Sequence, residues 1–155
     1  GFGSPAALGA KVARPERVVV ALIGDGGFGQ NPAALATAFE EDIAVIWVIM
    51  NNHAFGTIAG LEAAHYGTTF ATVFEKGGKT WSPDYAAIAR AYGVDGIKVA
   101  SAAEFKPALE QAIKAQRPVV LDVYMKNEPV PTAGHWNIMD IYSPGKKVHH
   151  VSTGD

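Results

Sequence analysis

The stretch RVVVALI at residues 17–23, followed by GDGGFG at residues 24–29, carries most of the information about the fold. The first run is apolar, rich in β-branched side chains and uninterrupted, which is typical of a strand buried on both faces of a parallel sheet. The glycines predict a tight turn. Asn31-Pro32 then combines a helix cap with proline at the first helical position, which predicts a helix to about residue 41.

The same alternation continues along the chain. Residues 43–50 (IAVIWVIM) predict a second buried strand, and Asn51-Asn52 follows it. Residues 51–60 are predicted to form a loop, and residues 61–81 carry no pattern that assigns them. Two further strands are predicted at 97–99 and 118–123, with helices at 4–13, 82–93 and 101–116, the last becoming regular near residue 105 because of Pro107. This order predicts the α/β class: an open parallel sheet with helices on both faces and ligands at the carboxyl ends of its strands.

Composition excludes several classes of function. The chain has 155 residues and a net charge of -2, so it lacks the basic excess of a general nucleic-acid binder. It has no cysteine, which excludes disulfides, thiolate zinc sites and cysteine nucleophiles. The longest apolar run falls far short of the roughly 20 residues that span a bilayer, and no secretory signal opens the chain, so we expect a cytoplasmic protein without a membrane partner.

The sequence predicts one folded domain followed by a tail. Residues 1–125 are predicted to form one ligand-binding domain, and the proline-containing residues 126–155 a tail. The chain begins with Gly1 and not with Met, so we expect a piece of a longer protein or one chain of a split one.

The glycine turn admits two chemistries. It satisfies G-x-G-x-x-G between a strand and a helix, which is the fingerprint of nicotinamide-binding units. Such units also place an acidic residue near the end of the second strand, where this chain has Asn51-Asn52. Asp25 would repel a pyrophosphate unless a cation lay between them. Mg²⁺ takes hard oxygen ligands and shares its shell with phosphates, so Asp25, Asn52 and a backbone carbonyl just after it favour a metal-diphosphate site.

The spacing of these residues resembles a known signature. Gly24-Asp25-Gly26, then 24 residues, then Asn51-Asn52 is similar to the thiamine-diphosphate motif. GFGSPAALGA at residues 1–10 resembles the MGFGLPAAIGA stretch of acetolactate synthases and related 2-oxo acid decarboxylases, and residues 82–93 resemble their PDF…AxAYG segment. The resemblance implies a thiamine diphosphate-binding fold, with thiamine diphosphate and Mg²⁺ as cofactors.

The family's site residues carry over position by position. The resemblance implies that Asp25 and Asn52 bind Mg²⁺ through their side chains and Ala54 through its carbonyl. It places these residues beside the cofactor: Gly1 and Phe2 near the aminopyrimidine, Gly24, Gly26, Gly27 and Phe28 along the diphosphate, and Asn52 and Ile58 in the loop that follows.

The resemblance also implies what this stretch does not supply. In the family the glutamate that activates the aminopyrimidine comes from a separate pyrimidine-binding domain, so no catalytic residue is expected here, and the working form is expected to be a homo- or hetero-oligomer. Simple pyruvate decarboxylases carry a glutamate where Ile58 stands, so the apolar residue favours a carboligase acting on a 2-oxo acid or another small carbonyl substrate. Gly60-Leu61 replaces the Gln-Trp of acetolactate synthases, which leaves the reaction open between decarboxylation and carboligation.

Other interpretations stay open at this point. The chain is alternatively a non-catalytic assembly subunit that keeps the fold, or a nicotinamide-dependent oxidoreductase. His53 is placed to face either substrate or solvent, and His65 suits packing or the surface. The tail with His135 and Trp136 suits an active-site lid or simple surface packing, and His149-His150 suits an exposed terminus.

Overall fold

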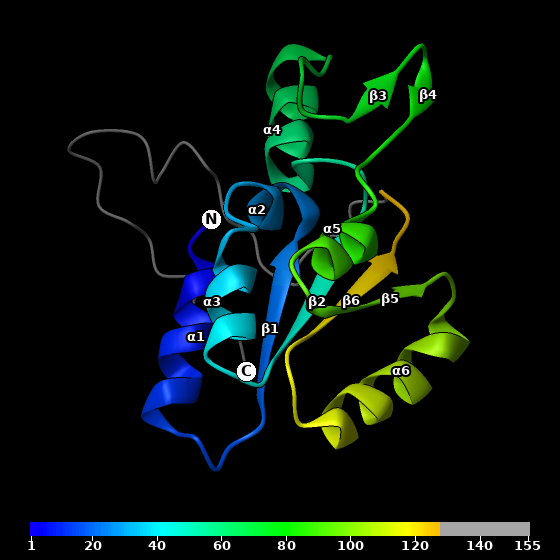
Figure 1. Cartoon of the computed structure of the whole chain (residues 1–155). Helices are drawn as coiled ribbons and strands as arrows, with labels where there is room; N and C mark the ends of the chain where they lie inside the picture. The colour runs from blue at the N-terminus through cyan, green and yellow to red at the C-terminus, as the bar shows by residue number, and fades with distance from the viewer. Residues whose placement is uncertain (128–155) are drawn as a thin grey trace, which may run out of the picture.

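A computed structural model of the protein describes residues 1–127, and a parallel sheet lies at its centre (Figure 1). Its strands are β1 (Val19–Gly24), β2 (Val45–Asn51), β5 (Asp95–Val99) and β6 (Val119–Tyr124), in the order β1-β2-β6-β5. Gly24 pairs in register with Met50, so the carboxyl ends of β1 and β2 lie side by side.

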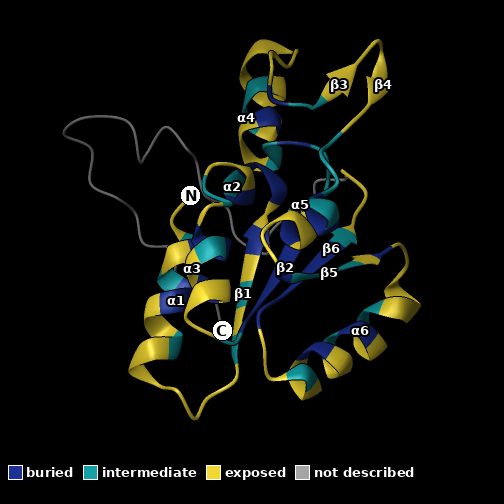
Figure 2. Cartoon of the chain, viewed as in Figure 1, coloured by how far each residue is buried: buried dark blue, intermediate teal, exposed yellow. Residues whose placement is uncertain are grey.

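Helices pack on both faces of this sheet, as the sequence predicts (Figure 2). α1 (Gly3–Ala13), α3 (Ala34–Glu40) and α5 (Tyr85–Ala91) cover one face around the buried Trp47. α6 (Ala102–Ala115) covers the other face, where Ala108 and Ala112 pack on β2 and β6. The prediction of an α/β open sheet is therefore confirmed.

The outer face of β1 departs from the prediction of a strand buried on both sides. Val19, Ala21 and Ile23 contact the helices of the first face. On the opposite face Val18, Val20 and Leu22 are 59%, 41% and 66% exposed. The cause is that α6 packs against β5 and β6, and no helix within residues 1–127 covers this face of β1.

Several boundaries differ from the sequence prediction. The glycine turn is itself a short helix, α2 (Asp25–Gly29). The predicted loop becomes helical from residue 56, in α4 (Gly56–Tyr66), and a hairpin of β3 (Glu75–Lys76) and β4 (Lys79–Thr80) follows it. α6 starts at Ala102, ahead of Pro107, and the Glu104 side chain in its first turn accepts a hydrogen bond from the Ala100 amide.

α4 and the hairpin form an arm that projects beyond the carboxyl edge of the sheet (Figure 1). Of the residues in α4, Ala59 alone is buried. Glu62 connects the helix to the segment that follows, since its carboxylate accepts hydrogen bonds from the Phe70 amide and the Thr72 hydroxyl. Those bonds hold the pKa of Glu62 below its usual range.

The predicted tail, residues 126–155, lies outside the described residues apart from Lys126 and Asn127, and so do His135, Trp136 and the two terminal histidines. Among the helices of residues 1–127, none combines the length and the apolar character that a bilayer crossing requires.

Candidate cofactor site

An open pocket of about 460 Å³ lies where the carboxyl ends of β1 and β2 meet. Most of the predicted site residues line it. Its walls are formed by Gly24, Asp25, Gly26, Gly27, Met50, Asn52, Ala54, Phe55, Gly56, Thr57, Ile58, Met125 and Lys126. A larger groove of about 630 Å³ lies at the opposite edge of the sheet, but exposed charged side chains such as Glu16 and Arg17 line it, and it contains no buried polar group.

Asp25 is the buried charge of this pocket. It is the first residue of α2 and is fully buried. Its Oδ1 accepts a hydrogen bond of 2.9 Å from the Gly26 amide, whereas its Oδ2 has no partner among the described residues. Burial raises the pKa of Asp25, and the nearby amides of Gly26, His53 and Ala54 offset only part of that rise. A buried carboxylate with an unpaired oxygen is costly unless a cation neutralises it.

Asn52 brings its side-chain amide to the same point. The amide atom that faces Asp25 lies 3.2 Å from Asp25 Oδ1 and 3.0 Å from the Ala54 carbonyl oxygen. With nitrogen at this position, the amide donates to both oxygens and closes the site without a cation. With oxygen there, three oxygens converge. Gly56 makes room for the amide, because a Cβ at residue 56 would lie 2.6 Å from Asn52 Nδ2.

The three oxygens fit a magnesium ion. At Mg–O distances of about 2.0–2.1 Å, neighbouring ligands of an octahedron lie roughly 2.9 Å apart, close to the observed separations. Residues 1–127 contain no cluster of three or more His, Cys, Asp or Glu side chains that could hold a metal. An ion bound here would therefore depend on carboxylate, amide and carbonyl oxygens, a donor set that suits Mg²⁺ together with phosphate oxygens.

The glycines of α2 leave bare backbone beside Asp25. A Cβ at Gly26 would overlap the Phe55 ring, so this glycine lets the loop after β2 pack directly on α2. Gly24 and Gly27 border the same pocket without such an overlap. A ligand entering the pocket would meet main-chain groups and not side chains at this wall.

Three of the predicted cofactor contacts lie outside the pocket. The Phe28 side chain is fully buried in the core, where it packs edge-to-face on Tyr85 with ring centroids 5.7 Å apart. Phe2 is 85% exposed, and Gly1 lies close to the side chain of Gln30. Ile58 does line the pocket, as an exposed apolar side chain in the first turn of α4.

His53 is held in place by its neighbours. Its backbone adopts a φ of 58°, and its Nδ1 lies 2.8 Å from the Ser82 hydroxyl oxygen. Its ring packs against Tyr124, with centroids 5.6 Å apart. The loop is also anchored from the arm, because the His53 carbonyl accepts a hydrogen bond from the Phe74 amide.

Sequence reasoning missed several walls of the pocket. Met50, Phe55, Thr57 and Met125 line it without belonging to any chemical motif. The alternation of extended backbone contained a usable signal for Met50, since Met50 lies two residues before the predicted ligand Asn52 and points to the same side.

Comparison of the sequence with known proteins is consistent with the fold and the pocket described above. Residues 1–123 match the family described as "Thiamine pyrophosphate enzyme, C-terminal TPP binding domain", thiamine pyrophosphate (TPP) being another name for thiamine diphosphate. A relative from Methanocaldococcus jannaschii, "Probable acetolactate synthase large subunit", is 40% identical over 79% of this chain and 20% of its own length. "Benzoylformate decarboxylase" of Pseudomonas aeruginosa is 35% identical over 79% of this chain and 22% of its own.

A solved structure agrees with the sequence matches. The thiamine diphosphate-dependent 4-hydroxybenzoylformate decarboxylase of Rhodococcus jostii RHA1 superposes with a TM-score of 0.72 at 33% identity. The superposition covers 81% of this chain and 23% of that one. The chain thus spans about a fifth of the length of the curated relatives it matches.

Proposed function

Because this chain belongs to the family of thiamine pyrophosphate enzymes, as their C-terminal TPP-binding domain, we propose that it anchors Mg²⁺ and thiamine diphosphate in an enzyme that decarboxylates or ligates 2-oxo acids. The family favours this function over the nicotinamide alternative. The single observation that supports the metal is the meeting of the Asp25 carboxylate, the Asn52 amide and the Ala54 carbonyl, with Asp25 Oδ2 buried and without a partner among the described residues.

Each residue of the site has a defined task. Asp25 supplies the charge that neutralises the cation, while Asn52 and the Ala54 carbonyl fix its direction from the neighbouring strand end. The bare backbone of α2 admits the diphosphate without a steric barrier. When bound, thiamine diphosphate supplies the carbanion that adds to a substrate carbonyl and then accepts the electron pair released on bond cleavage.

Ile58 shapes the choice of reaction. Its side chain borders the pocket and has no proton to give. An apolar side chain at this position leaves protonation of a substrate carbanion unassisted, which favours attack on a second carbonyl compound. This supports carboligation alongside decarboxylation.

The site needs a partner. Asp25 is the only carboxylate among the described residues that line the pocket, and the metal occupies it, so an activating acid has to come from elsewhere. The arm supports an interface at this edge, because Tyr66 at the end of α4 and, in the segments on either side of the hairpin, Phe70 and Trp81 are exposed. We therefore include a pyrimidine-binding domain or subunit, within a homo- or hetero-oligomer, in the proposal.

The test compares D25N with E41Q, the same chemical change at an exposed carboxylate on the opposite edge of the sheet. Calorimetric titration of thiamine diphosphate, with and without Mg²⁺, is expected to show Mg²⁺-dependent binding by the wild type and by E41Q. D25N is expected to lose at least 100-fold in affinity. Mg²⁺-dependent binding retained by D25N refutes the site. Cofactor binding without turnover of 2-oxo acids, measured with the pyrimidine-binding domain or subunit present, favours the assembly-subunit alternative.

A further inference from the structure

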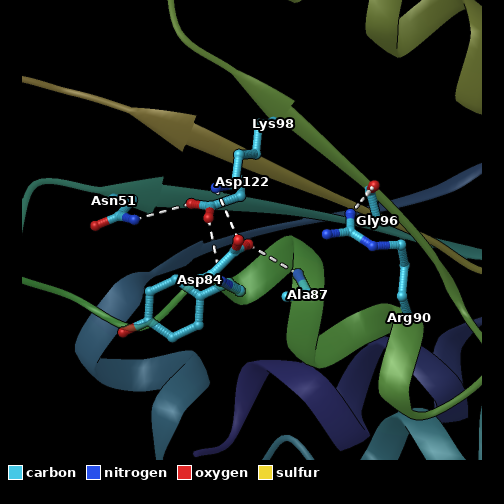
Figure 3. A network of polar contacts seen from close by, with 8 residues as sticks. Asn51, Asp84, Ala87, Arg90, Gly96, Lys98 and Asp122 are labelled. Atoms are coloured by element: carbon cyan, nitrogen blue, oxygen red, sulfur yellow. Dashed lines mark hydrogen bonds and ion pairs between the residues drawn. The ribbon is translucent and has the colours of Figure 1, made fainter.

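Asp122 is a second fully buried carboxylate, and the proposed site does not use it. It lies on β6, between the sheet and the start of α5 (Figure 3). Burial raises its pKa, as it does for Asp25, yet Asp122 lacks an ion pair with any Lys or Arg of residues 1–127. A buried charge without a cation needs hydrogen-bond donors to be tolerated.

Both oxygens of Asp122 are occupied. Oδ1 accepts a hydrogen bond of 2.9 Å from the Asn51 side-chain amide, and Oδ2 accepts one of 3.2 Å from the Tyr85 backbone amide. Asp122 therefore joins the end of β2 to the start of α5 from the strand that lies beside them.

The first of these bonds leads directly to the metal site. Asn51 precedes Asn52, and its fully buried amide donates to Asp122 while its Oδ1 has no partner. The backbone is held at the same place, since the Asn51 carbonyl accepts from the Met125 amide. Among the residues that the structure describes, Asp122 is thus the one side-chain anchor of Asn51, which precedes Asn52.

The second bond leads to the other half of the site. Tyr85, fixed at its amide by Asp122, packs its ring on Phe28 of α2, the helix that carries Asp25. Asp25 and Asp122 are both close enough for their charges to raise the pKa of the Tyr85 hydroxyl above the value set by burial. One carboxylate therefore supports both strand ends that supply the converging oxygens.

We propose that Asp122 is a positioning residue for the metal-diphosphate site, holding the Asn51-Asn52 turn and, through Tyr85, the underside of α2. The proposal rests on the function proposed above. Asp122 touches neither metal nor cofactor; its role is to limit the positions that Asn52 and Asp25 can adopt before the cation arrives.

The test uses a reversed pair in the full chain. In D122N the carboxamide cannot accept from both Asn51 and Tyr85, so we expect the Kd for thiamine diphosphate at fixed Mg²⁺ to rise at least tenfold. In D122N/N51D, Asn at 122 accepts from the Tyr85 amide and donates to Asp at 51, so the Kd should return to within threefold of the wild type. Loss without rescue overturns the positioning role, as does an unchanged Kd in D122N.

D84N is the matched control. Asp84 also serves the start of α5, accepting from the Ala87 amide and pairing with Lys98, but it has no bond to Asn51 (Figure 3). A Kd within threefold of the wild type is expected, and an equal loss in D84N and D122N would mean that any weakening of α5 disturbs the site, which overturns the proposal.

Misfolding of D122N and absence of binding by the wild type are distinguished by further measurements. If D122N does not fold, N51A removes the same hydrogen bond and leaves the Tyr85 contact in place; a tenfold loss supports the proposal and an unchanged Kd overturns it. If the wild type shows no Mg²⁺-dependent binding, the proposed function fails together with this inference, whereas normal wild-type binding with an unaffected D122N removes the inference alone.

Discussion

Asp25 and Asp122 occupy similar positions and have opposite surroundings. Both are fully buried near the carboxyl edge of one sheet, and burial raises the pKa of each. Both oxygens of Asp122 are held by donors from two different elements, whereas Asp25 Oδ2 has no partner among the described residues and Asp25 Oδ1 lies 3.2 Å from the Asn52 amide. The contrast teaches that burial alone does not identify a functional carboxylate. A buried carboxylate oxygen that lacks a hydrogen-bond donor is the more specific sign.

The largest expected difference is in stability. D122A should lower the free energy of unfolding by about 3 kcal/mol, because it leaves the Asn51 and Tyr85 donors buried and unpaired. D25A should cost less than about 1 kcal/mol, since it breaks one bond to the adjacent amide. Urea denaturation of the cofactor-free protein measures the free energy of unfolding of each variant. Equal losses in D122A and D25A would contradict the proposed difference between the two carboxylates.

Two glycines extend the comparison to packing. A Cβ at Gly96 would overlap the backbone carbonyl of Ala86, which cannot move without α5, so G96A should cost about 2–3 kcal/mol with little change in cofactor affinity. A Cβ at Gly26 would meet only the Phe55 side chain, so G26A should cost about 1 kcal/mol. G26A should nevertheless weaken thiamine diphosphate binding about tenfold. Paired denaturation and calorimetry check this, and a larger stability loss in G26A would contradict it.

Removing the unpaired charge should stabilise the protein that has no cofactor. D25N is expected to raise the free energy of unfolding by about 1 kcal/mol at pH 7, because the carboxylate has no counter-ion there. The folded-state pKa of Asp25 is raised, so the wild type regains stability as the pH falls through that pKa, and the advantage of D25N should shrink. Melting temperatures between pH 7 and pH 4 measure this, and an advantage that grows towards low pH would contradict it.

The smallest effect concerns Asp84, whose surroundings are partly solvent-exposed. Lys98 lies 2.7 Å away and, with the Ala87 amide, holds the pKa of Asp84 below its usual range. A depressed pKa stabilises the folded state above the unfolded value and loses that contribution as the pH falls through the folded one. D84N should therefore cost under about 1 kcal/mol at pH 7, and this cost should shrink as the pH falls towards 2. Urea midpoints of the wild type and D84N at the two pH values test this expectation. A difference that does not depend on pH would mean that only the hydrogen bond from the Ala87 amide matters.

Local patterns were enough to predict the centre of the molecule. The continuous apolar runs before Gly24 and Asn51 predicted β1 and β2 as adjacent parallel strands, and parallel pairing brings their carboxyl ends together whatever follows. The pocket walls at Asp25, Asn52 and Ala54 could therefore be anticipated from spacing.

Other features depend on contacts that spacing does not encode. α4 has no polar face, and Gly56 and Gly60 within it argue for a loop, so its helical state follows from anchoring through Glu62 and Ala59. The family resemblance places Phe28 along the diphosphate, but its ring points from α2 into the core. Asp122 is a single acid in an apolar strand, and only the fold shows that it faces Asn51.

The open outer face of β1 has a practical consequence for anyone who handles this chain. Within residues 1–127 no strand pairs with the outer edge of β1, and Val20 and Leu22 on the strand and Val18 just before it are exposed, so β1 is a template for pairing with another copy. We expect concentrated samples of the chain by itself to aggregate through this strand. Charged substitutions at Val20 and Leu22, which do not line the candidate cofactor site, offer a route to soluble material.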